Sequence, residues 1–135
     1  GQLKYDDILH AGHVNPDYTR YELHRVWIVE AKLKEGQRHL YSKRTFYMDE
    51  DSWSVVLADQ YNERSELWRT SVSYVKNYYE IPAIWTTVNV FHDLLSKRYF
   101  AQGLTNEEDS TLDISGDIPE NSHFTPSALR RMGRR

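Results

Sequence analysis

The sequence predicts a mainly β fold: a curved antiparallel meander of about six strands followed by a short C-terminal helix. Apolar and polar residues alternate with a period of two, and short polar segments typical of turns interrupt that alternation. Aromatic residues make up 13% of the chain, with only six Gly and four Pro, a composition typical of a packed globular chain. A length of 135 residues suits one domain with one sizeable core.

The first four strands are expected to form hairpins whose apolar faces coincide. The first strand runs from about Glu22 to Leu33, and Glu35-Gly36 supplies a two-residue turn that sets Leu23 opposite Met48 and Ala31 opposite Leu40. Polar turns at residues 49–52 and 62–65 close the next two hairpins. A register slip of one residue would turn a whole strand over, so the agreement of three hairpins supports the meander.

The same counting assigns partners across the second hairpin. It sets Met48 opposite Trp53, Phe46 opposite Val55 and Arg44 opposite Leu57. The apolar side chains of these strands would then share one face.

The remaining elements are shorter. Two further strands are predicted at Trp85 to Phe91 and Lys97 to Leu104, with inward faces that the pattern leaves open. Residues 105–123 are expected to be an acidic loop. Thr125-Pro126 is typical of a helix start and predicts a helix from Ser127 to Met132.

These elements divide the chain into three parts of one domain. Residues 1–20 are expected to be a loop with a strand-like patch at Tyr5 to Leu9, residues 21–104 the meander, and residues 105–135 the acidic loop with the short basic helix.

Charge and composition exclude several classes of function. The formal net charge is −3, there is no cysteine, and four Arg follow Phe124. Disulfides, cysteine metal sites and thiolate nucleophiles are therefore excluded. Nucleic acid is an unfavoured partner, because the chain is acidic overall and its aromatics are not interleaved with basic residues on one exposed face. The C-terminal arginines fit a solvated tail or a contact with anionic lipid.

Three segments resemble a known family: ELHRVWIVEAKLKEGQRHLYSKRTFYMDEDSW from Glu22, NYYEIPAIW from Asn77 and the closing FTPSALRRMGRR. They are similar to the C-terminal part of the bacterial outer-membrane lipoprotein-sorting-like proteins, a domain family of unknown function. The resemblance implies a LolA/LolB-like incomplete β-barrel that receives acyl chains in the periplasm. It also implies a fragment without the signal peptide and the N-terminal half, whose exposed aromatic face would favour a homodimer.

Eight residues form the predicted ligand-binding set. An acyl chain needs a broad apolar surface with few polar groups, although an aromatic row on a strand is often ordinary core packing. Arg44 and Asp59 are expected to lie near each other, either as an internal salt bridge or as a polar mouth for a headgroup. The remaining members of the set are Trp27, Phe46, Met48, Trp53, Trp68 and Tyr74.

Catalysis is a weaker interpretation. His10 and His13 with Asp6 and Asp7 upstream suggest a metal-dependent hydrolase, but Gly12 opposes the helix that would bring both imidazoles to one face. His92-Asp93 lacks an accompanying Ser or Cys elbow. We therefore expect neither enzyme activity nor a cofactor.

The sequence favours a periplasmic protein that binds or passes a lipid or a lipoprotein acyl chain. The alternative from another class is an interaction module that docks on an envelope transporter without a small ligand.

Overall fold

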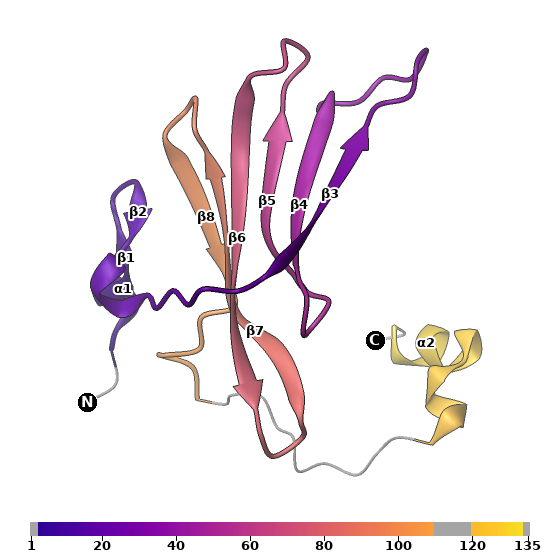
Figure 1. Cartoon of the computed structure of the whole chain (residues 1–135). Coiled ribbons are helices and arrows are strands. Elements are labelled where there is room, and N and C mark those ends of the chain that lie inside the picture. Colours follow the sequence, from indigo (N-terminus) through magenta and orange to yellow (C-terminus); the bar gives the residue numbers. More distant parts are fainter. Residues whose placement is uncertain (1–2, 110–119, 134–135) are drawn as a thin grey trace.

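A computed structural model describes residues 3–109 and 120–133 of the chain. Six consecutive strands form one antiparallel sheet in sequence order, and a two-stranded hairpin precedes it (Figure 1). The sheet does not close, because β3 and β8 are both edge strands. The elements are α1 (Tyr5–Ile8), β1 (Leu9–His10), β2 (His13–Val14), η1 (Pro16–Tyr18), β3 (Val26–Lys32), β4 (Lys43–Asp49), β5 (Val55–Tyr61), β6 (Leu67–Tyr78), β7 (Ala83–Asp93), β8 (Arg98–Gln102), η2 (Asn121–Phe124) and α2 (Pro126–Met132).

The mainly β class, the six-stranded meander and the C-terminal helix are therefore confirmed. Thr125 caps α2 as its sequence predicts, since its hydroxyl accepts a hydrogen bond from the Ala128 amide. The strand-like patch at Tyr5 to Leu9 is wrong, because Tyr5–Ile8 is a helical turn whose start is closed by a hydrogen bond from the Lys4 amide to Asp7.

The β3–β4 register differs from the prediction by four residues. Met48 lies opposite Trp27 and not Leu23, and Ala31 lies opposite Arg44 and not Leu40. The connection is longer than a two-residue turn: the Leu33 amide donates to the Ser42 carbonyl, 2.9 Å away. A shift of an even number keeps each side chain on its predicted face.

The β4–β5 register differs by an odd number, and this inverts the prediction for β5. Met48 pairs with Val55 and Tyr47 pairs with Leu57, so Val56 is an extra residue in a β-bulge. Phe46 consequently lies opposite Ala58 instead of Val55.

Two similar irregularities follow along the sheet. Trp68 is the extra residue between β5 and β6, and Thr87 is the extra residue between β6 and β7. Each bulge bends its strand and increases the local twist, as the fanned sheet in Figure 1 shows.

The N-terminal segment crosses one face of the sheet, which we call the covered face. The Tyr99 hydroxyl donates to the His10 carbonyl, and the hydroxyl groups of Tyr21 and Tyr74 are hydrogen-bonded at a distance of 2.8 Å. Val90, on this face, is fully buried. We call the other side of the sheet the open face, since these contacts leave it free.

The described residues bury few apolar side chains, namely Ile8, Ala58, Val90 and Ala128. The sizeable core expected from the sequence is therefore wrong for this chain, because one sheet lacks a second layer to pack against. No helix within residues 3–109 and 120–133 is long and apolar enough to cross a membrane.

Candidate functional site: an amphipathic open sheet face

An apolar row crosses the open face from one edge of the sheet to the other. Its two ends are exposed: Val29 is 43% accessible at the β3 edge, and Phe100 is 61% accessible at the β8 edge. Phe91 and Phe100 stack with ring centroids 6.1 Å apart. Strand pairing places the members side by side in the order Val29, Phe46, Ala58, Ser71, Phe91 and Phe100.

A polar row lies two residues along each strand and therefore on the same face. It contains three guanidinium groups and one carboxylate. Strand pairing gives the order Ala31, Arg44, Gln60, Arg69, Asp93 and Arg98. The open face is thus amphipathic, with the basic row towards the end of the sheet that holds the connections at residues 33–42, 62–66 and 94–97.

Asp93 organises the centre of the polar row. Its Oδ2 accepts hydrogen bonds from Arg69 Nε at 3.2 Å and from Trp68 Nε1 at 3.1 Å, and its Oδ1 accepts one from the Ser96 amide. The Ser96 amide, followed by Arg69, holds the pKa of Asp93 below its ordinary value. The Asp93 carboxylate therefore stays ionised and fixes Arg69 in place.

The Trp68 bulge supports this arrangement from the side. Arg69 lies 4.2 Å from the centroid of the Trp68 ring, and Tyr41 meets that ring edge-on. Arg69 Nη1 donates to the Tyr41 hydroxyl at 3.0 Å, which raises the pKa of the guanidinium. Arg69 is thus a charged group that Tyr41, Trp68 and Asp93 all hold in position.

A shallow groove of about 640 Å³ joins the two rows. Gln60 lies in it, with its Nε2 donating to the Ser71 hydroxyl and its Oε1 buried without a hydrogen-bond partner among the described residues. The groove is lined by Tyr41, Gln60, Arg69, Ser71, Phe91, His92, Asp93, Ser96, Arg98, Tyr99 and Phe100.

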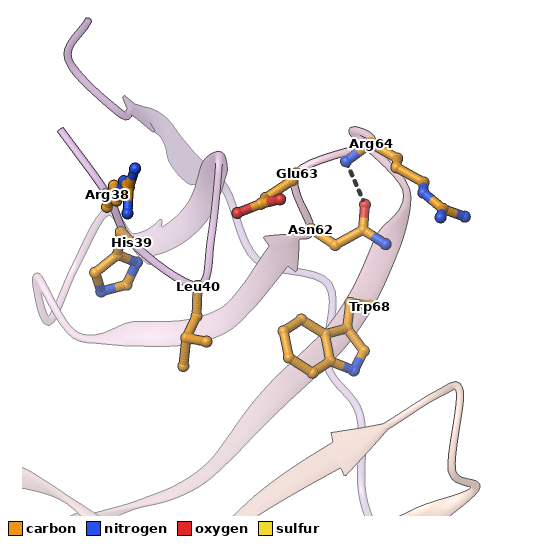
Figure 2. Close-up of a pocket in the computed structure, with 7 residues that line it drawn as sticks. All are labelled: Arg38, His39, Leu40, Asn62, Glu63, Arg64 and Trp68. Atoms are coloured by element: carbon orange, nitrogen blue, oxygen red, sulfur yellow. Dashed lines mark hydrogen bonds between the residues drawn. The ribbon is translucent and has the colours of Figure 1, made fainter. Parts of the chain in front are cut away.

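A second depression of about 820 Å³ lies beyond Trp68, between the β3–β4 and β5–β6 connections. Figure 2 shows Leu40 and Trp68 at its base and the charged side chains of Arg38 and Glu63 around it. The β5–β6 turn is fixed by Asn62, whose Oδ1 accepts from the Arg64 amide at 2.9 Å. This depression extends the amphipathic surface past the end of the sheet.

Four residues of the predicted binding set come together on the open face. Trp27 pairs with Met48 and Phe46 lies in the apolar row, while Arg44 lies in the polar row with its guanidinium 5.8 Å from the Phe46 ring. Trp27 is 54% exposed.

The predicted contact between Arg44 and Asp59 is wrong. Asp59 lies opposite Thr45 on the covered face, where it accepts hydrogen bonds from Thr70 at 2.9 Å and Tyr47 at 3.3 Å. Arg44 lies opposite Gln60. The Val56 bulge separates the two charges.

The other members of the set also lie elsewhere. Tyr74 faces the N-terminal segment, and burial, followed by the hydrogen bond to Tyr21, raises its pKa. Trp53 occupies the β4–β5 turn with a φ of 59° and is 67% exposed. Trp68 is the extra residue of the β6 bulge, beside the polar row, and its Nε1 donates to Asp93.

Apart from Trp68, sequence reasoning missed the residues that β6, β7 and β8 supply to the site. Arg69, Phe91, Arg98 and Phe100 were not in the predicted set. The signal that could have found them is strand pairing carried beyond the fourth strand, since Phe91 and Phe100 are then opposite each other.

The histidines suggested for metal binding lie together but belong to no group of three potential ligands among the described residues. His10 and His13 are opposite residues of the β1–β2 hairpin, with ring centroids 5.5 Å apart. Among the described residues, three potential ligands lie close together at His24, Asp49 and Asp51. Sequence reasoning missed this cluster. His24 precedes β3, whereas Asp49 is the last residue of β4 and Asp51 follows it.

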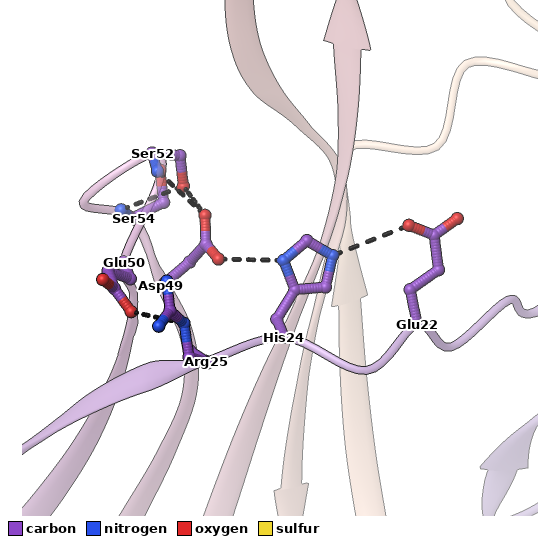
Figure 3. A network of polar contacts seen from close by, with 7 residues as sticks. All are labelled: Glu22, His24, Arg25, Asp49, Glu50, Ser52 and Ser54. Carbon is purple, nitrogen blue, oxygen red and sulfur yellow. Dashed lines mark hydrogen bonds and ion pairs between the residues drawn. The ribbon is translucent and has the colours of Figure 1, made fainter.

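The His24 cluster is explained by its internal contacts. Figure 3 shows His24 Nδ1 bonded to Asp49 Oδ1 at 3.0 Å, with Nε2 directed at Glu22. Asp49 Oδ2 accepts from the Ser52 amide and hydroxyl. Because the Ser52 hydroxyl donates to the carboxylate and not to the imidazole, the three groups are not connected as a Ser-His-Asp triad.

Comparison with known proteins finds a relative that matches nearly the whole chain. The chain is 48% identical over 132 residues to the uncharacterized protein PA3922 of Pseudomonas aeruginosa, covering 98% of this chain and 29% of that protein. The chain thus spans less than a third of the length of this relative.

Two crystal structures are similar to part of this chain. A DUF1329 family protein from Desulfovibrio piger has a TM-score of 0.47 at 17% identity, over 77% of this chain and 40% of that one. A domain named for outer membrane lipoprotein sorting, from Vibrio parahaemolyticus, has a TM-score of 0.45 at 13% identity, over 56% of this chain and 32% of that one. The family model described as protein of unknown function (DUF1329) matches residues 1–130, and the chain belongs to this family.

Proposed function

We propose that this domain is a non-catalytic binding protein of the bacterial cell envelope that holds an acyl chain on the open face of its sheet. The observation that carries the proposal is the apolar row, whose two ends stay exposed at Val29 and Phe100. Soluble proteins rarely leave a contiguous apolar patch open unless it is an interaction site. An apolar groove bordered by a few oriented polar groups is also the usual form of a small-molecule site.

The shape of the row suits a linear chain. Ala58 and Ser71 lie between Phe46 and Phe91, so the middle of the row carries small side chains and its flanks carry aromatic rings. An acyl chain lying along β5 and β6 would contact both flanks. Each buried methylene would contribute about 0.8 kcal/mol.

Support for a non-catalytic role comes from how the titratable groups near the face are used. Asp93 accepts three hydrogen bonds that hold Trp68, Arg69 and the β7–β8 turn. His92 lies on the opposite face, stacked on Tyr99 with centroids 5.6 Å apart, and burial lowers its pKa. The contacts of Asp93 and His92 thus give each group a structural role.

Binding of cis-parinaric acid, followed by its fluorescence, tests the proposal. We expect the wild-type chain to bind it and the double variant Phe91→Ala, Phe100→Ala to bind about tenfold more weakly. Leu129→Ala, which removes a 70% exposed side chain from α2, is the matched control. Equal affinity of the double variant and the wild type would refute an acyl site on this face.

A second candidate function is an interaction module that docks on an envelope transporter or on a second copy of this chain. The observation that favours it is β3, an edge strand whose seven residues are all exposed. A free edge strand offers backbone groups to a partner strand. If the chain binds no acyl probe and native mass spectrometry shows a dimer that the substitution Ile28→Lys abolishes, this candidate replaces the first.

A further inference from the structure

We propose that the polar row binds the headgroup of the amphiphile, and that this headgroup is anionic and carries a hydroxyl group. This inference rests on the proposed function, since it names the chemical class of the ligand held on the same face. It follows from the charges in the row, from one unsatisfied acceptor and from the distance between the two rows.

The polar row has more positive than negative charge. Asp93 is its only carboxylate, and Arg69 occupies one of the oxygens at 3.2 Å. Arg44 and Arg98 are exposed and form no salt bridge with a described acidic residue. Guanidinium groups bind phosphate and carboxylate oxygens through paired hydrogen bonds. The row therefore offers to an anion two guanidinium groups that form no salt bridge within residues 3–109 and 120–133.

The positions of the arginines suit one headgroup. Neighbouring strands lie about 4.8 Å apart, so Arg44 and Arg98 each lie about 10 Å from Arg69 across one intervening strand. The long side chains of Arg44 and Arg98 can extend towards Arg69. The position of Arg69 is fixed by its contacts with Tyr41, Trp68 and Asp93. A single anion above Arg69 is thus within reach of a second guanidinium.

Gln60 adds a requirement that the headgroup carry a hydrogen-bond donor. It lies between Arg44 and Arg69 in the row, and its Oε1 is buried without a partner among the described residues. A buried carbonyl without a hydrogen bond costs about 1–3 kcal/mol. Because Gln60 lines the groove, a rotation of its amide would expose this oxygen to the headgroup, where a hydroxyl group could donate to it and an anion could not.

The two rows are spaced for one molecule. Gln60 and Arg69 lie two residues from Ala58 and Ser71 along β5 and β6, which is about 7 Å. A headgroup above Arg69 would therefore place the first methylenes of its chain over Ala58 and Ser71, between the Phe46 and Phe91 rings. The boundary between the polar row and the apolar row would thus lie where the headgroup of the amphiphile joins its alkyl chain.

Three single-chain lipids with the same alkyl group test the inference by isothermal titration below their critical micelle concentrations. Hexadecylphosphoglycerol has one negative charge and hydroxyl groups, hexadecyl methyl phosphate has the same charge and no hydroxyl group, and hexadecylphosphocholine is zwitterionic. We expect hexadecylphosphoglycerol to bind about tenfold more tightly than hexadecylphosphocholine, with hexadecyl methyl phosphate between them. The preference should shrink as salt is added.

Variants assign the preference to the row. Arg44→Gln with Arg98→Gln should remove most of the advantage of the anionic lipids, and Gln60→Met should remove the advantage of hexadecylphosphoglycerol over hexadecyl methyl phosphate. Arg25→Gln, at the opposite end of the sheet, should change neither. These substitutions lie at accessible or partly accessible positions, and circular dichroism verifies that each variant is folded.

The possible failures are distinguishable. If none of the three lipids binds, the proposed function itself fails. If all three bind equally and the arginine variants behave as wild type, the acyl site stands and the headgroup inference is overturned. If sn-glycerol 3-phosphate, which has no chain, binds as tightly as hexadecylphosphoglycerol, the row is a site for free phosphate esters and the lipid headgroup is again excluded.

Discussion

His24 and Asp49 join the N-terminal segment to the end of β4, through a contact of 3.0 Å between Nδ1 and Oδ1. The hydrogen bond to Asp49 raises the pKa of His24 above its ordinary value of 6.5. The bonds from Ser52, followed by the one to His24, lower the pKa of Asp49 below 3.8. The ion pair therefore needs both a protonated imidazole and an ionised carboxylate.

We expect this pair to stabilise the fold most between about pH 3.8 and pH 6.5. The His24 contribution is complete below the unfolded pKa of the imidazole and is lost as pH rises through its raised folded pKa. The Asp49 contribution is complete above the unfolded pKa of the carboxyl group and is lost as pH falls through its lowered folded pKa. Melting temperatures of wild type and His24→Gln, measured from below pH 3.8 to above pH 6.5 with His13→Gln as control, test the effect. A constant difference at every pH would contradict it.

Val90 and Phe91 are adjacent in β7 but should respond to substitution in different ways. Val90 is fully buried and Phe91 is 43% exposed. We expect Val90→Ala to lower the free energy of unfolding by about 2 kcal/mol, through lost burial and the cavity left behind. Phe91→Ala should cost less stability but weaken acyl binding. Urea titrations and probe binding on both variants check this, and a larger stability loss for Phe91→Ala would count against the two-face assignment.

Arg44 and Asp59 should be energetically independent. They lie on opposite faces, and Asp59 is bonded to Tyr47 and Thr70. Arg44→Gln should change the free energy of unfolding by about 0–1 kcal/mol, as for other exposed charges. In a double-mutant cycle with Asp59→Asn, the coupling should stay below about 0.5 kcal/mol. A coupling of several kcal/mol would restore the salt bridge that the sequence suggested.

Gly103 should tolerate no side chain. Its φ is 103°, and a Cβ there would lie 3.0 Å from the carbonyl oxygen of Thr87, the extra residue of the β7 bulge. We expect Gly103→Ala to cost at least about 1–2 kcal/mol. Gly36 also has a positive φ of 76° but open space around it, so Gly36→Ala should cost less. Thermal unfolding of both variants tests this prediction. A larger loss of stability for Gly36→Ala than for Gly103→Ala would contradict it.

Local signals in the sequence were enough to predict the strands and the helix. Alternation in β3 and β4 and the Thr125 cap of α2 depend on residues close together in the chain, which is why they could be recognised. The β3–β4 connection was judged too short, but the even shift preserved the faces of Trp27 and Met48.

The candidate site was less predictable, because it depends on register across several strands. Val55, Val56 and Leu57 are consecutive apolar residues, so alternation could not show which of them is the extra one. In β7, the neighbours Val90 and Phe91 are both apolar, and the pattern did not reveal which faces the N-terminal segment. Pairing partners from distant parts of the chain decide both questions.

The Val56 bulge also determines the electrostatics of the sheet. If Val56 paired regularly with Tyr47, alternation would bring Asp59 opposite Arg44, and one more guanidinium of the polar row would be neutralised internally. The bulge at Val56 thus places opposite charges on opposite sides of one layer. The affinity of the open face for an anion would then depend on this bulge, and a change that let Val56 pair regularly would reverse it without altering any residue that touches the ligand.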